Sequence, residues 1–543
     1  MRAREAVGPH LGNGTPPPAA PAAREPRMGR SIVTTYAARF ASIVAYVALL
    51  PIVLHTFGAD AYGVYVLTVS VGALSQQNLG IGDATTRFIA VAAGARDPER
   101  MRRIASASWA FYLVIAVVMS LATALAFAFT LTHAKDVPAD LHATGWILAA
   151  LGVANVFCML IFSTNRQILG GLGRLDEVNY LLIGQAALRI VLTVVVCLTD
   201  LGIVAVGAVD LAATLAFGVV SFLLRHRRAR DVRPTLRGFE WRVFRELFGV
   251  SAQLMVLGVA SVVIMQVGGI LTAVLLPIAF TAVYAAAQRV FLLVKEVTNS
   301  LSIAVLPTAS MQFGEADHRG NARLYLRGTT LANILMTLVL VPVLAFLPQI
   351  MQWWIGPPGI QAALVAQILI VSMFANNNHV LGIPILTAQG SVRGYAILHT
   401  VWAVTGCLLA YVLGERMGIA GIALGLTIPV VLLEPLYIRI ALRRLSISLR
   451  AFVLRCLVAP FATVILPAAG LIALGRMIAF GPGGVIALSA AWVVVAAVVY
   501  WFLGLDEESR TVIRRAWAAA RRAAPAAPDQ RTVREGLPDV DNR

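Results

Sequence analysis

Residues 105–131 read ASASWAFYLVIAVVMSLATALAFAFTL, which is 27 residues without a charged side chain. Arg102 and Arg103 precede this stretch, and Lys135 follows it. A helix of about 20 apolar residues crosses the ~30 Å hydrocarbon core of a bilayer, because each residue adds about 1.5 Å. The stretch therefore predicts a transmembrane helix with basic residues beyond both ends.

The same pattern recurs along all but the ends of the chain. The 543 residues are 59% hydrophobic and 13% charged, whereas soluble domains average about 25% charged residues. We therefore expect an all-α polytopic membrane protein with about 14 transmembrane helices. The predicted spans lie near residues 31–53, 61–82, 105–131, 144–164, 180–198, 203–224, 247–270, 279–304, 326–347, 363–386, 394–414, 419–442, 451–475 and 484–504.

The basic residues are distributed unevenly between the two sides of these spans. Of the 44 Lys and Arg residues, 36 fall in segments on one side, and only Lys135, Arg416 and Arg476 fall on the other. Cytoplasmic loops retain cations, so the bias predicts that both termini are cytoplasmic. It also accounts for the net charge of +17 without nucleic acid as a partner, since no zinc or RNA-binding motif accompanies that charge.

Matching motifs about 217 residues apart indicate an internal repeat. Asp97 with Arg103 matches Asp317 with Arg323, and Gly202 matches Gly418 in the same order along the chain. We infer two parallel six-helix repeats with a substrate site at their interface. The predicted divisions are a disordered cytoplasmic tail (1–30), an N-lobe (31–224), a basic cytoplasmic connector (225–245), a C-lobe (246–445), spans 13 and 14 (451–504) and a second cytoplasmic tail (505–543).

Five cations lie within or against the predicted spans: Arg39, Arg87, Arg189, Arg289 and Lys295. One charged residue at the bilayer centre costs about 2.5–3.5 kcal/mol on insertion scales, so these side chains should face the bundle interior or a wet cavity. Guanidinium groups bind phosphate oxygens in a bidentate way. We interpret the cations as a substrate-binding set for an anionic phosphate or pyrophosphate group. The alternative is that each one pairs with a buried acid.

Two stretches add polar residues to the predicted cavity. Residues 75–87 carry Gln76, Gln77, Asn78 and Asp83 midway through a stretch that is too long for one straight crossing. Such polar, glycine-interrupted helices are typical of transporter cavities or hinges. The equally weighted alternative for Asp83 is a local salt bridge with Arg87, four residues on.

The tenth predicted span carries Asn376, Asn377, Asn378 and His379, and we expect a kinked, cavity-lining helix there. We expect no catalysis by His379, because no nucleophile or acid neighbours it in sequence.

Three acids, Asp210, Glu296 and Glu434, are embedded in predicted spans. For Glu434, near a basic helix end, pairing with Arg439 or Arg443 is the simpler account. Asp210 or Glu434 could instead carry a coupled proton, and Glu296 could serve in ion coupling. We expect no cofactor and no metal site, and the sequence leaves H⁺ or Na⁺ coupling open.

Several segments resemble one known family in the same order along the chain. Gly58 with Tyr62-Gly63 resembles a Gly-x-x-x-Tyr-Gly turn, and residues 78–87 resemble an Asp-Leu-Gly-x-x-x-Ala-x-x-Arg stretch with Asn78 in place of Asp. Residues 166–174 resemble a Leu-Gln-Gly-x-x-Arg loop, and residues 282–289 the start of an eighth span. Residues 31–504 thus look like a Wzx-type oligosaccharide flippase of the multidrug/oligosaccharidyl-lipid/polysaccharide exporter (MOP) superfamily.

This resemblance implies two six-helix bundles in a V around a central cavity that works by alternating access. It further implies a bacterial inner-membrane flippase that moves undecaprenyl-pyrophosphate-linked oligosaccharide units, as used for O-antigen, capsule or exopolysaccharide, to the periplasmic leaflet. Membrane lipids and a polysaccharide polymerase or chain-length complex are the expected partners.

Three other functions compete with this one. One rival is a flippase for the peptidoglycan precursor, and another is a cation-coupled multidrug exporter of the same superfamily. An enzyme is not expected, because the longest loop on the poorly basic side, 348–362, holds no Arg, His or acid.

Overall fold

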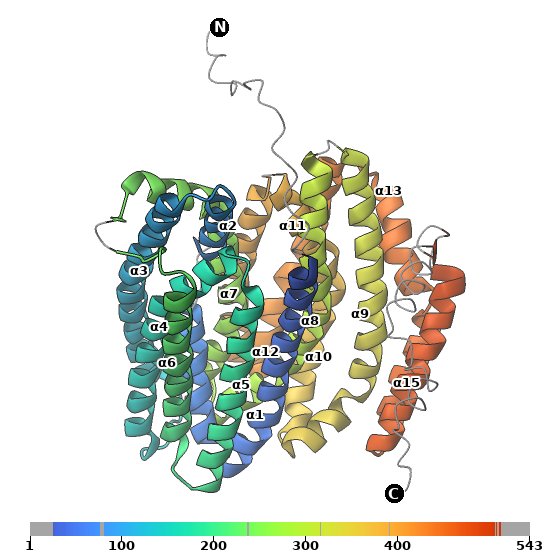
Figure 1. Ribbon diagram of the computed structural model, residues 1–543. Helices are drawn as coiled ribbons and strands as arrows, with labels where there is room; N and C mark the ends of the chain where they lie inside the picture. Colours follow the sequence, from blue (N-terminus) through green and yellow to red (C-terminus); the bar gives the residue numbers. More distant parts are fainter. Residues whose placement is uncertain are drawn as a thin grey trace, which may run out of the picture.

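The computed structural model describes residues 25–75, 81–235, 238–314, 317–389 and 391–504, with residues 507, 510 and 511 besides. Helices dominate these residues, and their one β-type contact is an isolated parallel bridge between Lys135 and Pro277 (Figure 1). The prediction of an all-α polytopic membrane protein is confirmed.

The helices run roughly alongside one another through the molecule (Figure 1). Their bounds are α1 Glu25–Ser75, α2 Ile81–Gly94, α3 Pro98–His133, α4 Leu141–Gly171, α5 Leu175–Leu198, α6 Ile203–Arg228, α7 Trp241–Leu275, α8 Ala279–Gly314, α9 His318–Ile355, α10 Gly359–Val380, α11 Gly382–Ala388, α12 Arg393–Leu445, α13 Leu449–Phe452, η2 Val453–Ala462, α14 Ile465–Met477, α15 Pro482–Val499 and η3 Tyr500–Gly504.

The number of spans depends on how the broken helices are counted. Within the described residues, ten helices are long and apolar enough to cross a membrane. The number of spans rises to eleven if the bent pair Leu449–Ala462 and Ile465–Met477 is counted as one further span. The helix α8 is not among the ten, and it is the helix that carries Arg289, Lys295 and Glu296. The 53-residue α12 would be about 80 Å long if straight, well over one bilayer thickness.

Glycines break the two longest helices where the sequence predicts turns between spans. Gly58 interrupts α1 and Gly418 interrupts α12, both with non-helical backbone angles. Gly418 (φ 64°, ψ −144°) matches Gly202 (φ 80°, ψ 166°), which caps α6. Residues with a Cβ rarely adopt such angles, so glycine is required at both turns. The repeat seen in the sequence therefore recurs in the backbone.

Helix caps repeat in the same way. The Asp97 side chain accepts a hydrogen bond from the Arg100 backbone N–H at the start of α3. The Asp317 side chain does the same for Gly320 at the start of α9. Each cap satisfies a backbone N–H that the first helical turn leaves without a partner. The sequence offset of 220 between these aspartates is therefore also an offset between equivalent helix starts.

One predicted span differs from expectation in its course. Part of the predicted span 61–82, residues 76–80, lies outside the described residues; α1 is described as far as Ser75 and α2 from Ile81. The predicted span 451–475 is not one straight helix, because it bends by 41° between Ala462 and Ile465. A π-helical segment that contains Pro460 precedes the bend. Proline removes a backbone donor and displaces the preceding turn, which accounts for the irregularity.

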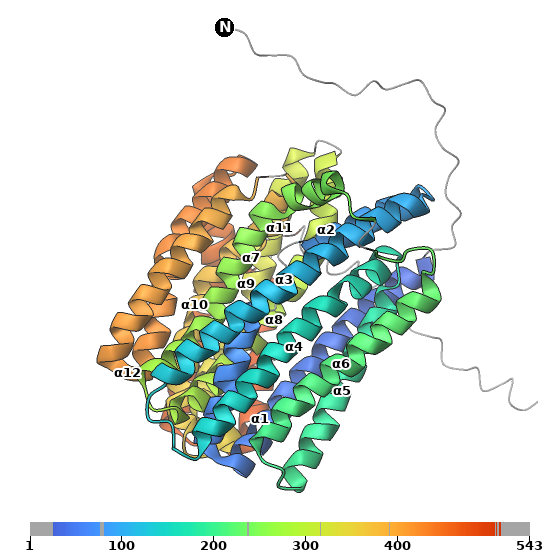
Figure 2. The same cartoon turned by 90° about the vertical axis from the view of Figure 1, so that its left-hand side faces the viewer.

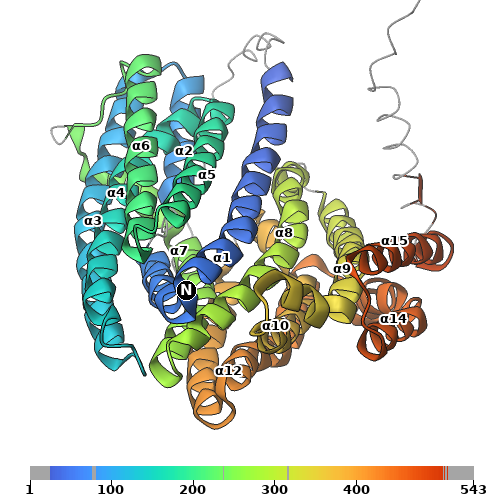
Figure 3. The ribbon, with the colours of Figure 1, turned by 90° about the horizontal axis from the view of Figure 1, so that it is seen from below.

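The helices form two lobes, and α1 of the first lobe packs against helices of both. Figures 2 and 3 show α2–α6 gathered on one side of the molecule and α8–α12 on the other. One apolar core joins the lobes and contains Val64 and Leu148 from the first together with Ala282 and Val365 from the second. The final helices, α14 and α15, lie outside this arrangement against α9.

Backbone hydrogen bonds join the lobes at the end that carries Lys135. The Lys135 N–H donates to the Ala273 carbonyl at 2.9 Å, and the Ile278 N–H donates to the Lys135 carbonyl at 3.1 Å. Gly63 packs directly against the Ile278 carbonyl, where a Cβ would not fit. The turn between α7 and α8 is thus fixed to the first lobe at this end.

Ion pairs join the connector and the start of α7 to α3 at the opposite, basic end. Arg103 contacts Glu240 at 3.2 Å, and Arg100 contacts Glu246 at 3.8 Å. Arg225 is buried at the end of α6 and donates to the Asn165 side chain of α4 at 2.7 Å. The basic connector therefore packs on the first lobe as well as linking it to α7.

Candidate functional site

A cavity of about 440 Å³ lies between helices of both lobes. Its walls come from α1, α4, α5 and α6 on one side and from α7 and α8 on the other. The cavity contains two of the five cations expected in spans, Arg189 and Arg289. Two polar side chains in its lining, Asn155 and Thr193, have buried oxygen atoms without a hydrogen-bond partner in the described part of the chain.

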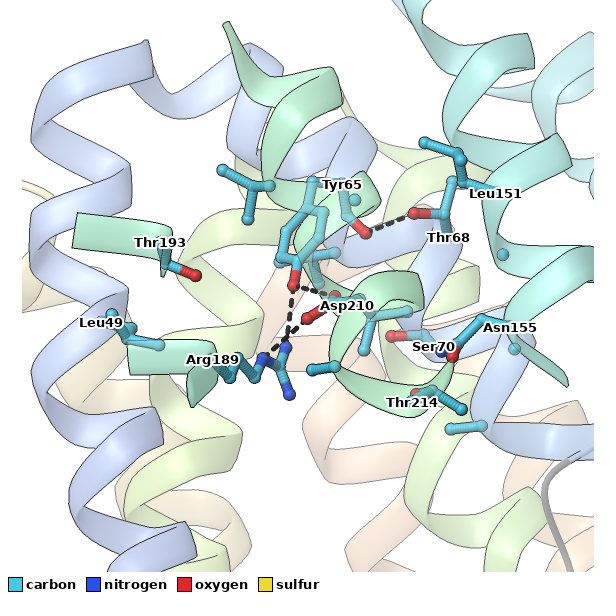
Figure 4. Close-up of a pocket in the computed structure, with 18 of the residues that line it drawn as sticks. Leu49, Tyr65, Thr68, Ser70, Leu151, Asn155, Arg189, Thr193, Asp210 and Thr214 are labelled. Atoms are coloured by element: carbon cyan, nitrogen blue, oxygen red, sulfur yellow. Dashed lines mark hydrogen bonds and ion pairs between the residues drawn. The ribbon is translucent and has the colours of Figure 1, made fainter. Parts of the chain in front are cut away.

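Arg189 belongs to a three-residue cluster on the first-lobe side of this cavity (Figure 4). Its Nε lies 2.7 Å from a carboxylate oxygen of Asp210, which projects from α6. The Tyr65 hydroxyl, from α1, donates to the other Asp210 oxygen at 2.6 Å and accepts from an Arg189 terminal nitrogen at 2.9 Å. The cluster is electrically neutral and ties three helices together.

This geometry supplies the buried acid partner that the sequence left as an alternative for Arg189. The Arg189 and Asp210 side chains are 23% and 14% exposed, respectively. The pair is thus close to the cavity and only partly shielded from it. Asp210 therefore neutralises much of the charge of Arg189 beside the cavity.

Arg289 lies on the second-lobe side of the same cavity, on α8 beside Gln288. The Gln288 side-chain amide donates to the Met265 carbonyl of α7, which positions this turn of α8 against its neighbour. The structure thus brings Arg189 and Arg289 into one cavity from different lobes. Their function as ligands for a substrate remains a prediction.

Arg166 is a lining residue that the sequence did not single out. It counts among the basic residues near a predicted loop, but α4 extends to Gly171, and Arg166 lines the cavity. Its guanidinium lies 5.5 Å from the centre of the Phe217 ring, and no carboxylate oxygen lies within 4.0 Å of it among the described residues. The signal available from sequence was its position directly after the predicted fourth span.

A second polar constellation lies inside the C-lobe, away from the cavity lining. His379 Nδ1, on α10, is 2.6 Å from an oxygen of Glu434, on α12. The expected pairing of Glu434 with Arg439 or Arg443 is therefore wrong, because the carboxylate points into the lobe and both arginines are exposed. An acid does neighbour His379, although in space and not in sequence.

The asparagines of α10 hold neighbouring helices together. The Asn377 side chain donates to Asn333 of α9 at 2.7 Å, and Asn333 donates both to Asn378 and to the Cys456 carbonyl of η2. These buried bonds link α9, α10 and η2. Asn377 thus lies in a helix-to-helix network, outside the cavity between the lobes.

The remaining predicted site residues lie elsewhere. Arg87 is exposed on α2 and does not line the cavity. Lys295 and Glu296 are partly buried on α8, beyond the cavity lining. Gln76, Gln77 and Asn78, and the side chains of Arg39 and Asp83, lie outside the described residues. Nowhere in the described ranges do three or more His, Cys, Asp or Glu side chains gather to hold a metal ion.

The fold and the cavity define a multi-pass helical membrane protein with two lobes around a polar site. Among solved structures, the chain is similar to an inward-facing multidrug-resistance transporter of the MATE family of the MOP superfamily. The TM-score is 0.66 at 18% identity over 74% of this chain and 94% of that one. The fold is therefore that of a MATE transporter.

Two further solved structures share this fold. An outward-facing MATE transporter of the MOP superfamily gives a TM-score of 0.59 at 17% identity, over 77% of this chain and 95% of that one. The third is a MOP superfamily transporter from Pyrococcus furiosus, whose reversed pocket polarity suggests a different function. Its TM-score is 0.53 at 17% identity, over 77% of this chain and 94% of that one. No family model matches the chain, and no curated protein matches it.

Proposed function

We propose that this protein is a transporter that moves an anionic, lipid-linked oligosaccharide across the membrane by alternating access. The observation that carries the proposal is the charge of the cavity. Its described lining contains three arginines, Arg166, Arg189 and Arg289, and one acid, Asp210, which amounts to 3 − 1 = +2. A cavity with excess positive charge favours an anionic ligand.

The arrangement of these charges supports a phosphate or pyrophosphate head group. Asp210 lies 2.7 Å from Arg189, and Arg166 and Arg289 reach the same cavity from opposite lobes. Guanidinium forks bind phosphate oxygens in a bidentate way. A volume of about 440 Å³ is within the usual range of about 300–1,000 Å³ for small-ligand sites. The sugars would cross inside the cavity, while the polyprenyl tail stays in lipid.

The same charge argues against a multidrug exporter for organic cations, the second candidate that the fold favours. An organic cation is stabilised in a cavity by unpaired acids or by aromatic faces. Tyr62, Phe162 and Phe217 supply aromatic rings to the lining, but its one described acid, Asp210, is already paired with Arg189. A flippase for the peptidoglycan precursor would share the anionic head group, so cavity charge does not separate it from this proposal.

The basic end of the molecule completes the proposal. Arg100 and Arg103 are at the end opposite Lys135, and the positive-inside rule assigns the more basic end to the cytoplasm. We propose a bacterial inner membrane with both termini cytoplasmic. No enzymatic step is proposed, and a polymerase or chain-length complex is the proposed partner after transport.

The experiment is deletion of the gene, followed by complementation. We expect the deletion to abolish surface polysaccharide and to trap lipid-linked units on the cytoplasmic leaflet. Wild-type protein and the exposed-arginine control Arg230→Gln should restore export, whereas an Arg166→Gln/Arg289→Gln variant that reaches the membrane should not. Unchanged polysaccharide together with new sensitivity to cationic drugs would instead establish the multidrug exporter. Loss of growth with accumulated peptidoglycan precursor would establish the precursor flippase.

A further inference from the structure

A second hollow, a groove of about 670 Å³, lies at the end of the C-lobe, and it shares no lining residue with the cavity between the lobes. Its walls come from the last turns of α12, from the turn that follows that helix, and from α13 and η2. Most of the lining is apolar, with side chains such as Leu442 and Leu457. The polar members of the described lining are Arg439, Arg443 and Ser446, and no acid is among them.

The turn after α12 explains why a groove forms here. Ser446 has a left-handed backbone (φ 54°, ψ 41°), and the Ile447 N–H donates to the Leu442 carbonyl at 2.9 Å. The chain therefore reverses within a few residues, and the Ser448 side chain caps α13. Beyond this turn, η2 packs mainly against α9. Helix α12 and η2 thus diverge and leave the groove between them.

The inner wall of the groove is rigid and well packed. The Phe452 ring, which belongs to the lining, is fully buried and stacks on the Tyr325 ring of α9 with 6.0 Å between centroids. Val453 and Leu457 continue the wall along η2. This segment is a ten-residue π-helix, a conformation that is rare and that occurs often at functional sites. An apolar chain that enters the groove therefore meets a preformed wall.

The two arginines of the groove lie on one face of α12. Arg439 and Arg443 are four residues apart, so their side chains are neighbours on the helix surface. Both are exposed, and no carboxylate oxygen lies within 4.0 Å of either among the described residues. Along the chain, no Asp or Glu occurs between Glu434 and Asp506. The groove therefore combines an apolar wall with positive charge that the protein does not neutralise there.

The matching end of the N-lobe neutralises its arginines. Arg228 of α6 matches Arg444 of α12 at an offset of 216. Arg228 lies 3.8 Å from Glu177, and Glu240 of the connector lies 3.2 Å from Arg103. No acid of the described chain has this role beside the groove. The positive charge at the end of α12 is therefore available to a ligand from outside the protein.

The groove opens toward the bilayer at the basic end of the molecule. Helix α13 lies at the same end as α2 and α11 (Figure 1). Exposed apolar side chains continue from the groove along both of its walls, with Leu432 and Leu436 on α12 and Leu454 and Val458 on η2. Such side chains face lipid in a membrane-spanning helix. The arginines thus lie where a phospholipid head group would be, and the apolar wall lies where its chains would be.

We propose that this groove is a binding site for an anionic phospholipid of the leaflet at the basic end. The phosphate lies between Arg439 and Arg443, whose guanidinium forks match phosphate oxygens. An acyl chain lies against Leu442, Val453 and Leu457. The proposal does not depend on the transported substrate, because it uses none of the cavity residues.

Charge and shape together select this ligand class. A small soluble anion would leave the apolar wall exposed to water, and a zwitterionic lipid would bring no net charge to the arginines. A basic peptide would be repelled by them. Basic pockets between helices on the cytoplasmic side of membrane proteins bind anionic head groups in this way.

The first test measures lipid binding to the detergent-purified, full-length protein by native mass spectrometry. Phosphatidylglycerol is titrated against phosphatidylcholine with the same acyl chains. We expect one phosphatidylglycerol molecule to bind wild type more tightly than phosphatidylcholine does. Arg439→Gln/Arg443→Gln should weaken this binding by about tenfold or more, the effect of losing a hydrogen bond to a charged group.

The matched control is Arg444→Gln/Arg450→Gln. It removes the same charge from exposed arginines of the same end that do not line the groove, so it should bind phosphatidylglycerol as wild type does. An equal loss in the two double variants would overturn the site, because it would show a diffuse basic surface. Equal affinity of wild type for both lipids would overturn it as well, because only a nonselective lipid contact would remain.

The second test removes space for the acyl chain and keeps the charges. Val453→Trp fills the groove from its η2 wall, whereas Val458→Trp places the same ring on the exposed face of η2, outside the lining. Val453→Trp should lose the tightly bound phosphatidylglycerol, and Val458→Trp should keep it. Retention in a folded Val453→Trp variant would contradict an acyl chain in the groove.

A competition experiment distinguishes the membrane phospholipid from the lipid part of the proposed substrate. Undecaprenyl pyrophosphate also carries phosphates on an apolar chain. If it fails to displace phosphatidylglycerol from wild type at equal concentration, the groove is a phospholipid site whatever the protein transports. If it displaces phosphatidylglycerol and loses its own binding in Arg439→Gln/Arg443→Gln, the groove belongs to the substrate, and the phospholipid proposal is wrong.

Discussion

The two lobes use equivalent helix pairs for different chemistry. In the C-lobe, His379 of α10 contacts Glu434 of α12. The sequence offsets of 217 and 216 place Phe162 of α4 and Gly218 of α6 at these positions in the N-lobe. There the Phe162 ring packs on the bare Cα of Gly218, where a Cβ would not fit. An apolar contact in one lobe thus occupies the place of an ionisable pair in the other.

Helices α5 and α6 show the opposite difference, because here the N-lobe has the ion pair and the C-lobe does not. Arg189 of α5 and Asp210 of α6 form the ion pair beside the cavity. An offset of 216 leads to Thr405 and Leu426 of α12 in the C-lobe. Thr405 bonds its own helix, and Leu426 packs in the shared apolar core. The comparison teaches that the repeat preserved backbone geometry while each lobe acquired its own polar site, one beside the cavity and one sealed.

The largest expected effect comes from breaking the N-lobe pair. Among the described residues, Arg189→Gln leaves the Asp210 carboxylate with the Tyr65 hydroxyl as its one close partner. Removing one partner of a fully buried pair costs about 3–5 kcal/mol, and the partial exposure of this pair reduces that to about 2–3 kcal/mol. Thermal unfolding in detergent measures the loss. The double variant Arg189→Gln/Asp210→Asn should recover most of it, and a double variant no more stable than the single one would contradict the ion-pair account.

Removal of the Arg166 guanidinium should weaken ligand binding and leave folding unchanged. Arg166→Gln deletes a guanidinium that has no carboxylate partner among the described residues. A hydrogen bond to a charged group contributes about 1.5–3 kcal/mol, so affinity should fall by about ten- to a hundredfold. Titration with a soluble pyrophosphate-linked sugar measures this fall. Arg230→Gln is the control, and equal affinities in the two variants would remove Arg166 from the site.

The apolar counterpart of the C-lobe pair should tolerate no added volume. Gly218→Val places methyl groups where the Phe162 ring lies, and such overpacking costs about 1–3 kcal/mol. Thermal unfolding should therefore show a loss of stability that Phe162→Ala in the same chain partly restores. A neutral Gly218→Val would show that α4 and α6 can separate at this contact.

The smallest effect should be the same in both lobes. Asp97→Ala and Asp317→Ala each remove a side-chain cap on a backbone N–H, which costs about 1 kcal/mol. We expect the two losses of unfolding free energy to agree within about 0.5 kcal/mol, with Asn variants near wild type. Clearly unequal losses would show that the two caps are not equivalent features of the repeat.

Much of the fold follows from local sequence, whereas the pairing of charges does not. The caps at Asp97 and Asp317 and the turns at Gly202 and Gly418 are set by a few neighbouring residues, so the repeat was visible in the chain. The Arg189–Asp210 contact requires two helices to present the correct faces to each other. Hydrophobic spans this long carry little periodicity to fix those faces.

The sequence by itself determined that this is a helical membrane protein with a duplicated half and a strong charge bias. Transfer into the bilayer depends on the summed apolarity of about 20 consecutive residues, and that sum needs no tertiary information. Only the tertiary structure decided that Arg166 lines the cavity and that Glu434 meets His379 and not a nearby arginine. Those outcomes depend on helix rotation and helix ends, which packing between distant segments fixes.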